Sequence, residues 1–265
     1  MEPLDFPCPN IGRLKVFGNR LHDGHDFVVK SNAKSSTVDY LVFLDSRGIS
    51  REFEGSLADK LITQIAQIGG SYLLVVRPLE LTTWATLINF MAINTVKPAK
   101  IITNMGFVDF TPKKKAILED AMQQVNFIIG KGIATAGFAE VFVSSAGEKI
   151  DLYSMSYADE FKKSIENIAI QIPTVIINTP IVDQNIKLER KRPHTFFTAL
   201  ADSAEFNRAI TGAQIVNFPH FYEILTYDAV HYTQHGNEAI FEKIKAYLWK
   251  KKKFVPKKYS MNICV

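Results

Sequence analysis

The chain has 265 residues, of which 47% are hydrophobic and 22% charged, and its formal net charge is +4. These ordinary globular values exclude wholesale disorder, collagen-like repeats and low-complexity character, and they allow one large domain or two small ones. No apolar run approaches the ~18 residues of a bilayer-spanning helix, and the acidic, proline-broken start is unlike a secretory signal, so we expect a cytoplasmic protein with no transmembrane segment.

Five short apolar segments, rich in valine, isoleucine and tyrosine, predict buried strands. Their apolarity is nearly continuous instead of alternating, which is typical of a parallel sheet covered on both faces. In chain order the segments are Asp39–Leu44, Ser71–Arg77, Lys100–Thr103, Thr174–Asn178 and Ala213–Asn217.

Helical patterns separate these strands. Ser56 with Asp59 resembles a capping box, and Thr111-Pro112 is typical of an N-cap followed by the first helical residue. The predicted helices cover about 56–68, 82–93, 111–129, 156–168 and 236–248. Strands that alternate with helices predict right-handed βαβ units and a three-layer α/β domain.

One segment interrupts this alternation. Ala139–Val143 and Lys149–Tyr153 flank a Ser-Ser-Ala-Gly turn and predict an inserted β-hairpin at about 138–154. We therefore expect one α/β domain over residues 36–249. Residues 1–35 are expected to form an N-terminal extension, with a strand near Asp26–Lys30.

The positive charge belongs to the C-terminal tail. Residues 250–265 hold six lysines and no acidic residue, so the other 249 residues carry 25 basic and 27 acidic side chains, a net of −2. The common explanation of such a terminus is a solvated end, and we expect no nucleic-acid partner. The sequence does not predict an oligomeric state.

In an open α/β sheet, ligands bind beyond the carboxyl ends of the strands. The first predicted strand runs directly into Asp45-Ser46-Arg47-Gly48. A hydroxyl on such a strand-to-loop turn can face the crevice, although Ser46 taken alone also fits an ordinary turn residue.

Asp228 precedes His231 by three residues near the end of the chain. A carboxylate at this spacing can orient an imidazole and stabilise its protonated form, the support that a histidine needs to act as general base toward a serine. Asp228, His231 and His235 also have a spacing at which a helix could present metal ligands. Gly236 interrupts that segment and no second ligand cluster supports it, so we predict no metal and no cofactor.

Taken in order, these pieces resemble the SGNH (GDSL-like) hydrolase family. Leu44-Asp45-Ser46 resembles its first block, Met105–Asp109 its third, and Asp228-Ala229-Val230-His231 its fifth. The resemblance implies a flavodoxin-like α/β/α sandwich with a five-stranded parallel sheet in the order 2-1-3-4-5. It also implies a serine nucleophile at Ser46, a general base and acid at His231, and Asp228 as the residue that orients it.

The sequence departs from the family pattern at its oxyanion hole. Val108 replaces the third-block asparagine, and no glycine matches the second block after Arg77. The loss of one oxyanion donor typically lowers the rate by about 10²–10³-fold. The candidate donors are then Ser46, Gly106 and the amide of Asn104.

The resemblance predicts a serine esterase that works through an acyl-enzyme on a small-molecule or carbohydrate ester, for example an acetyl ester of a sugar. Two alternatives stay open. An O-acyltransferase of the same fold would pass the acyl group to another hydroxyl, and a non-catalytic SGNH-like domain would bind a ligand without turnover.

Overall fold

The computed structural model describes residues 3–8, 10–17, 28–49, 51–78, 81–130, 134–182, 189, 191–217 and 225–249. The lysine-rich tail predicted at 250–265 lies outside these described residues. Among them, no helix combines the length and the apolar character that crossing a membrane requires.

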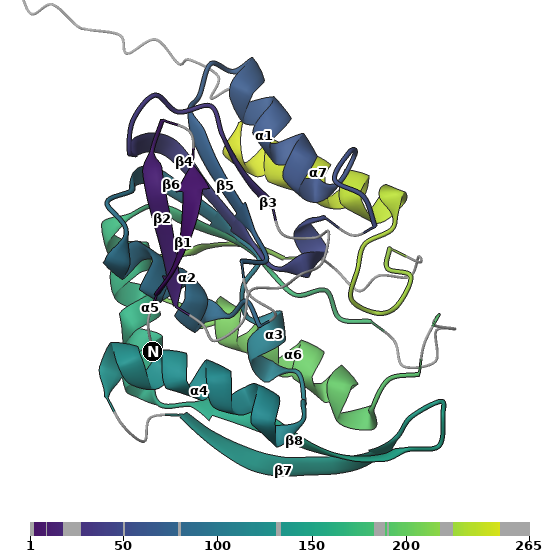
Figure 1. Ribbon diagram of the computed structural model, residues 1–265. Coiled ribbons are helices and arrows are strands. Elements are labelled where there is room, and N and C mark those ends of the chain that lie inside the picture. The colour runs from purple at the N-terminus through teal and green to yellow at the C-terminus, as the bar shows by residue number, and fades with distance from the viewer. Residues whose placement is uncertain are drawn as a thin grey trace, which may run out of the picture.

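A central six-stranded sheet organises the molecule (Figure 1). Five strands are parallel and stand in the order β5-β4-β6-β9-β10, and β3 pairs antiparallel with β5 at one edge. The five parallel strands that the sequence predicted are present, and the antiparallel edge strand β3 makes the sheet mixed. The strands are β3 (Val28–Ser31), β4 (Thr37–Leu44), β5 (Tyr72–Val76), β6 (Lys97–Thr103), β9 (Thr174–Ile177) and β10 (Gln214–Val216).

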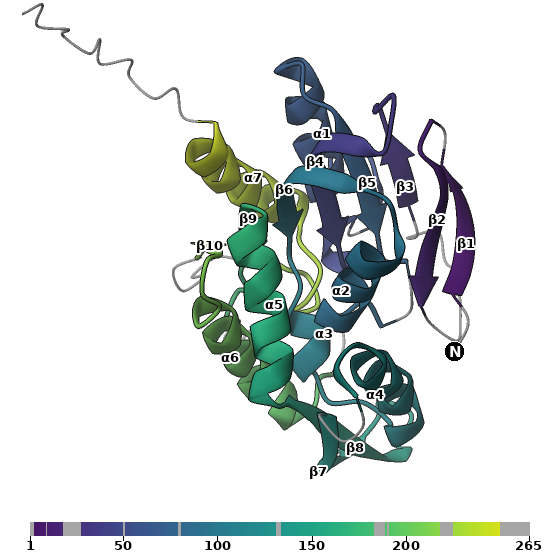
Figure 2. The same cartoon turned by 90° about the vertical axis from the view of Figure 1, so that its left-hand side faces the viewer.

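Helices cover both faces of the sheet, as the predicted α/β class requires (Figures 1 and 2). On one face, α1 (Leu57–Gln67) and α7 (Gln234–Leu248) pack side chains such as Leu61 and Ile244 against the strands. On the other, α2 (Trp84–Ile93) and α5 (Asp159–Gln171) contribute Trp84 and Phe161. Each such side chain is almost fully buried, which stabilises the fold by about 1.5–3 kcal/mol per large apolar residue.

Three further helices complete the described chain. They are α3 (Phe107–Phe110), α4 (Lys115–Ile129) and α6 (His194–Arg208). The sequence analysis did not predict α6, although a crossover between β9 and β10 requires an element there. One 3₁₀ turn, η1 (Ser46–Gly48), directly follows β4.

Two predicted helix starts were wrong for an identifiable reason. The helix predicted from Thr111 begins instead at Lys115, because Lys113 exchanges both backbone hydrogen bonds with Tyr153 (2.9 and 2.8 Å). The helix predicted from Ser156 begins at Asp159, because Ser156 is still part of a strand. By contrast, Ser56 caps α1 as expected, with its side chain accepting the Asp59 N–H.

Two antiparallel hairpins lie outside the central sheet (Figure 2). The N-terminal segment forms β1 (Pro3–Cys8) and β2 (Gly12–Phe17). The inserted hairpin consists of β7 (Ala134–Val143) and β8 (Lys149–Tyr157), both longer than predicted, and it packs on α4. The Lys113–Tyr153 pairing fixes this hairpin to the loop that follows α3.

Candidate active site

Ser46 occupies the predicted position at the carboxyl end of β4. The strand ends at Leu44, and Asp45 then caps the short turn η1, its carboxylate accepting the Arg47 N–H at 2.9 Å. The turn closes with the Gly48 N–H donating to the Asp45 carbonyl. This local geometry makes Ser46 the first residue of the turn, facing the crevice beyond the strand ends.

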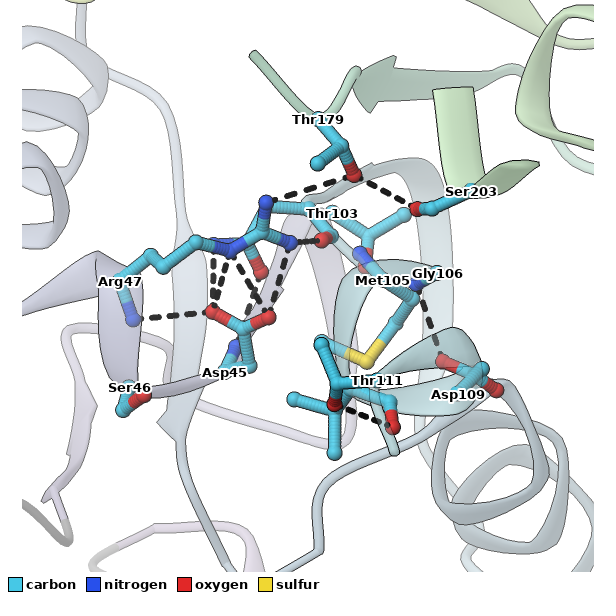
Figure 3. A network of polar contacts seen from close by, with 12 residues as sticks. Asp45, Ser46, Arg47, Thr103, Met105, Gly106, Asp109, Thr111, Thr179 and Ser203 are labelled. Atoms are coloured by element: carbon cyan, nitrogen blue, oxygen red, sulfur yellow. Dashed lines mark hydrogen bonds and ion pairs between the residues drawn. The ribbon is translucent and has the colours of Figure 1, made fainter. Parts of the chain in front are cut away.

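The two residues on either side of Ser46 in the chain form a buried ion pair (Figure 3). The Arg47 guanidinium contacts the Asp45 carboxylate at 2.8 Å, and both side chains are 1% exposed. Arg47 also donates to the Asn104 carbonyl and lies over the Phe107 ring. Neither partner is predicted to be buried from the sequence, because charged side chains are seldom fully buried unless paired.

Asp228 and His231 lie on one tight loop before α7. The Asp228 carboxylate accepts the backbone N–H groups of Val230 and His231. Ala229, which lies between Asp228 and Val230, takes a φ of 66° at the bend. Backbone bonds from Tyr227 to His231 and from Thr233 to Leu225 close the loop. The loop therefore holds the carboxylate and the imidazole in a fixed relation.

The loop packs closely on the start of α7. Gly236 sits in the first turn of that helix, where a Cβ atom would meet the Leu225 carbonyl oxygen at 2.1 Å. Only glycine permits this approach. The residue that interrupts the metal-ligand pattern in the sequence is thus the one that lets the loop dock.

The structure brings Ser46, His231 and Asp228 together. His231 Nε2 lies 3.1 Å from Ser46 Oγ, and His231 Nδ1 lies 3.1 Å from Asp228 Oδ2. The two ring nitrogens thus contact the hydroxyl on one side and the carboxylate on the other, across 185 residues of sequence separation.

Asp228 is held as a carboxylate. Burial alone would raise its pKa, but the ring and backbone N–H groups of His231 and the guanidinium of Arg192, 2.7 Å away, together hold the pKa of Asp228 well below its usual value. Arg192 also donates to the Asp228 carbonyl, and its guanidinium lies over Phe196. No signal in the sequence pointed to Arg192.

Two of the predicted oxyanion donors are engaged elsewhere. The Asn104 side chain donates to the Asp45 carboxylate at 3.0 Å and accepts the Asp45 N–H at 2.8 Å. The Gly106 N–H donates to Asp109 at 3.1 Å. The Gly106 N–H and one N–H of the Asn104 amide therefore already have acceptors, and the role of both residues as oxyanion donors stays a prediction.

The backbone of Arg77 is strained. It directly follows β5 and takes a φ of 47°, in the left-handed region where bulky residues are rare. Its N–H donates to the Leu44 carbonyl at 2.8 Å, which ties the turn to the strand that precedes Ser46. Arg77 thus adopts a glycine-like conformation in the loop where the family pattern would place a glycine.

Asp109 is fully buried beside the candidate site. Its carboxylate accepts the Trp84 N–H at 2.9 Å, the Gly106 N–H and the Tyr157 hydroxyl. Burial raises the pKa of Asp109 to about 6, although these hydrogen bonds and the nearby Lys113 ammonium oppose that shift. A carboxyl with this pKa titrates in the mildly acidic range.

We expect the free energy of unfolding to fall by about 2 kcal/mol more in wild-type protein than in the Asp109→Asn variant as the pH rises from 4 to 7. Asp109 has a pKa of about 6 when folded and ~3.9 when unfolded. Between those values the folded state binds a proton that the unfolded chain has lost, so raising the pH disfavours folding. Urea unfolding at several pH values measures this slope. The exposed Asp151→Asn change should retain the wild-type slope, and parallel curves for wild type and Asp109→Asn would contradict the expectation.

A cleft of about 770 Å³ opens in front of Ser46 and His231. One wall comes from the inserted hairpin, through Phe142, Ser144 and Ser145 near its turn. The hairpin is therefore part of the site and not a distant appendage. The remaining lining residues come from the loops after β4, β5 and β6 and from the segments around 191–196 and 227–231.

Within the described part of the chain, no three His, Cys, Asp or Glu side chains gather as metal ligands would. His235 is in the first turn of α7, beyond the loop that carries Asp228 and His231.

Comparison with known proteins gives only distant likenesses. No protein-family model and no curated protein matches the chain. Among solved structures, a protein described as a GDSL-like lipase from Parabacteroides merdae is 12% identical, with a TM-score of 0.39, and the match covers 79% of this chain and 95% of that one. Est1E from Butyrivibrio proteoclasticus is 11% identical, with a TM-score of 0.35, over 94% of this chain and 100% of that one. At these TM-scores neither likeness carries a functional conclusion.

Proposed function

We propose that this protein is a serine hydrolase of the SGNH kind that cleaves esters, with Ser46 as nucleophile, His231 as general base and acid, and Asp228 as the residue that orients His231. The observation that carries this proposal is the pair of contacts at the imidazole, 3.1 Å from Nε2 to the Ser46 hydroxyl and 3.1 Å from Nδ1 to Asp228. These distances are within hydrogen-bond reach, the geometric condition for a base and its nucleophile.

In the proposed reaction, Ser46 Oγ attacks the ester carbonyl carbon while His231 Nε2 takes the hydroxyl proton. The tetrahedral intermediate then expels the alcohol, which receives that proton from His231, and leaves an acyl group on Ser46. Water attacks the acyl-enzyme with His231 again as base, and collapse of the second intermediate releases the acid and restores the Ser46 hydroxyl. Asp228 stabilises the imidazolium that forms in each half of the reaction.

The Ser46 backbone N–H is the oxyanion donor that we propose. Ser46 is the first residue of η1, where N–H groups have no partner within the turn, and its N–H has no acceptor in the described part of the chain. Because each oxyanion donor is worth about 10²–10³ in rate, a site with this donor alone would be slower than one with several. An acetyl ester of a carbohydrate as the substrate stays a prediction from the family resemblance.

Labelling with a fluorophosphonate probe tests the proposal. We expect the probe to modify wild-type protein at Ser46 and to leave the Ser46→Ala variant unlabelled, because only a serine paired with a base reacts readily. Ser164→Ala, which removes a hydroxyl from α5 outside the cleft, is the matched control and should label as wild type does. Intact-mass analysis and peptide mapping give the site. Well-folded wild-type protein that stays unlabelled would contradict the proposal.

One observation favours the alternative of a non-catalytic binding domain. The Gly106 N–H and one of the two N–H groups of the Asn104 amide, which the sequence analysis considered as oxyanion donors, donate to buried carboxylates. A binding domain would retain the cleft without an activated serine. Absence of labelling at Ser46 is the result that this alternative predicts.

A further inference from the structure

The charge of the cleft in front of Ser46 is one-sided. Among the residues that the structure describes, four cationic side chains and no acidic side chain line it; the four are Arg77, Lys113, Lys191 and Arg192. A water-filled concavity lined by one sign of charge concentrates ligands of the opposite sign. The positive charge of this lining therefore favours ligands that carry a negative charge.

The acidic groups near the cleft already have partners behind its surface. Asp228 pairs with Arg192 at 2.7 Å, and Asp109 is fully buried and accepts hydrogen bonds from Trp84 and Gly106. Burial lowers the pKa of Lys113 to about 7, with Asp109 opposing the shift, so Lys113 is a weaker source of positive charge at neutral pH.

Two more acidic residues near Lys191 are also engaged. Glu189 pairs with Arg51 at 2.6 Å, and Glu140 of the hairpin accepts the Thr195 hydroxyl at 2.9 Å at the start of α6. Neither carboxylate lines the cleft. Asp228 offsets the charge of Arg192, and Asp109 lies beside Lys113. By contrast, in the described part of the chain no ion pair joins Lys191 to either of these two glutamates.

Lys191 is the cation best placed to receive a ligand. Its ammonium donates to the Val143 carbonyl at 3.0 Å and lies 5.7 Å from the centre of the Phe142 ring. These partners are neutral, and within the described ranges the ammonium makes no ion pair. One hydrogen bond anchors the side chain at the hairpin, and an ammonium has two further N–H donors.

The rest of the lining is largely apolar. Phe107, Phe142 and Phe196 contribute aromatic rings to the cleft, and Leu81, Leu152 and Val230 add aliphatic surface. Ligand sites of this kind bind through apolar walls and take their specificity from a few polar groups. Among the described lining residues, the polar groups are cations, hydroxyls and the His231 imidazole.

We infer that the cleft takes an ester that joins an apolar group to a negatively charged one, and that Lys191 receives the negative charge. The ester in this inference rests on the proposed function, whereas the negative charge rests on the lining alone. Attraction between the Lys191 ammonium and the anionic group would raise both the association rate and the affinity of the ester. Added salt would screen this attraction and weaken the effect.

Paired esters test the inference by kinetics. The first pair is the p-nitrophenyl monoester of glutaric acid and the same ester with its free carboxylate methylated, which differ in charge on the acyl side. The second pair is m-acetoxybenzoate and its methyl ester, which differ in charge on the alcohol side. In at least one pair we expect the anionic member to have a kcat/KM about tenfold higher at low ionic strength, a preference that salt diminishes. A ratio at or below unity in both pairs, from protein that labels at Ser46, would overturn the inference while leaving the proposed function intact.

Single substitutions test whether Lys191 is the cation that receives the anionic group. Lys191→Gln is expected to reduce the anionic-to-neutral ratio of kcat/KM by about threefold to fivefold, the usual value of a partly exposed ion pair. Lys97→Gln removes the same charge at the amino end of β6, away from the cleft, and should retain the wild-type ratio. An unchanged ratio in Lys191→Gln would contradict the role given to that residue.

A binding measurement gives an answer even if no ester turns over. Anilinonaphthalene sulfonate joins an apolar ring system to an anion, and phenylnaphthylamine is its neutral analogue. We expect Lys191→Gln to raise the Kd of the sulfonate by about threefold and to leave the Kd of the neutral dye unchanged. Equal sulfonate affinity in wild type and Lys191→Gln would overturn the inference independently of any result at Ser46.

Discussion

Replacing Asp228 with asparagine is expected to lower kcat by about 10⁴-fold, with a much smaller change in KM. The amide keeps the shape of the carboxylate and can still accept from Arg192. With the amide oxygen in the place of Oδ2, its NH₂ group would replace Oδ1, which lies 3.2 Å from His231 Nδ1, and would favour the tautomer with the proton on Nε2. That tautomer cannot take a proton from Ser46.

Steady-state hydrolysis and the rate of fluorophosphonate labelling are the two measurements for this variant. Both should fall together, because both need the same activated serine. Asp151→Asn, a change of the same kind on an exposed residue of the hairpin, is the control and should behave as wild type. If Asp228→Asn turned over substrate at the wild-type rate, His231 would not depend on this carboxylate.

Replacing Arg47 with methionine is expected to reduce the free energy of unfolding by about 3–5 kcal/mol. The guanidinium is the cationic partner of Asp45, and both side chains are 1% exposed. Removing it leaves a carboxylate buried without its counter-charge, and the loss of the pair costs far more than the loss of an exposed one. Since the two members of the pair flank Ser46 in the chain, labelling at that serine should also slow.

The same variant has an internal check. In the double change Asp45→Asn with Arg47→Met, neither position of the pair holds a charge, so the double variant should recover part of the stability lost by Arg47→Met alone. Arg51→Met removes a guanidinium from an exposed pair with Glu189 and should leave the urea midpoint unchanged. A midpoint for Arg47→Met equal to that for Arg51→Met would show that the buried pair contributes no stability.

The parallel strands were predictable because each is a short apolar run between polar boundaries, and the observed bounds differ from the prediction by only a few residues. Helix α6 was missed because polar residues interrupt its apolar face. Ser203 and Asn207 are both fully buried and bond across the core, Ser203 to Thr179 at 2.7 Å and Asn207 to the Met105 carbonyl at 2.9 Å. A periodicity argument counts such residues as solvent-facing.

The proximity of Ser46 and His231 was expected from the family resemblance, from the position of Ser46 after a predicted strand and from that of His231 before the last predicted helix. Their supporting groups were not. The burial of Arg47 and the pairing of Arg192 with Asp228 depend on contacts between segments far apart in the chain, and short sequence patterns do not encode such contacts. The bonds that join Asn104 to Asp45 likewise link two segments 59 residues apart, and no sequence pattern indicated them.

The loop that carries Asp228 and His231 makes its main bonds within itself. The carboxylate accepts the backbone N–H groups of Val230 and His231, and the loop is closed at its base between Leu225 and Thr233. Alignment of acid and imidazole is therefore a local property of a few consecutive residues, whereas alignment with the hydroxyl is a property of the whole sheet. A graft of this loop into another α/β scaffold would transfer the oriented imidazole, and the recipient would have to supply a serine within hydrogen-bond reach of Nε2, an oxyanion donor and a cation in the place of Arg192.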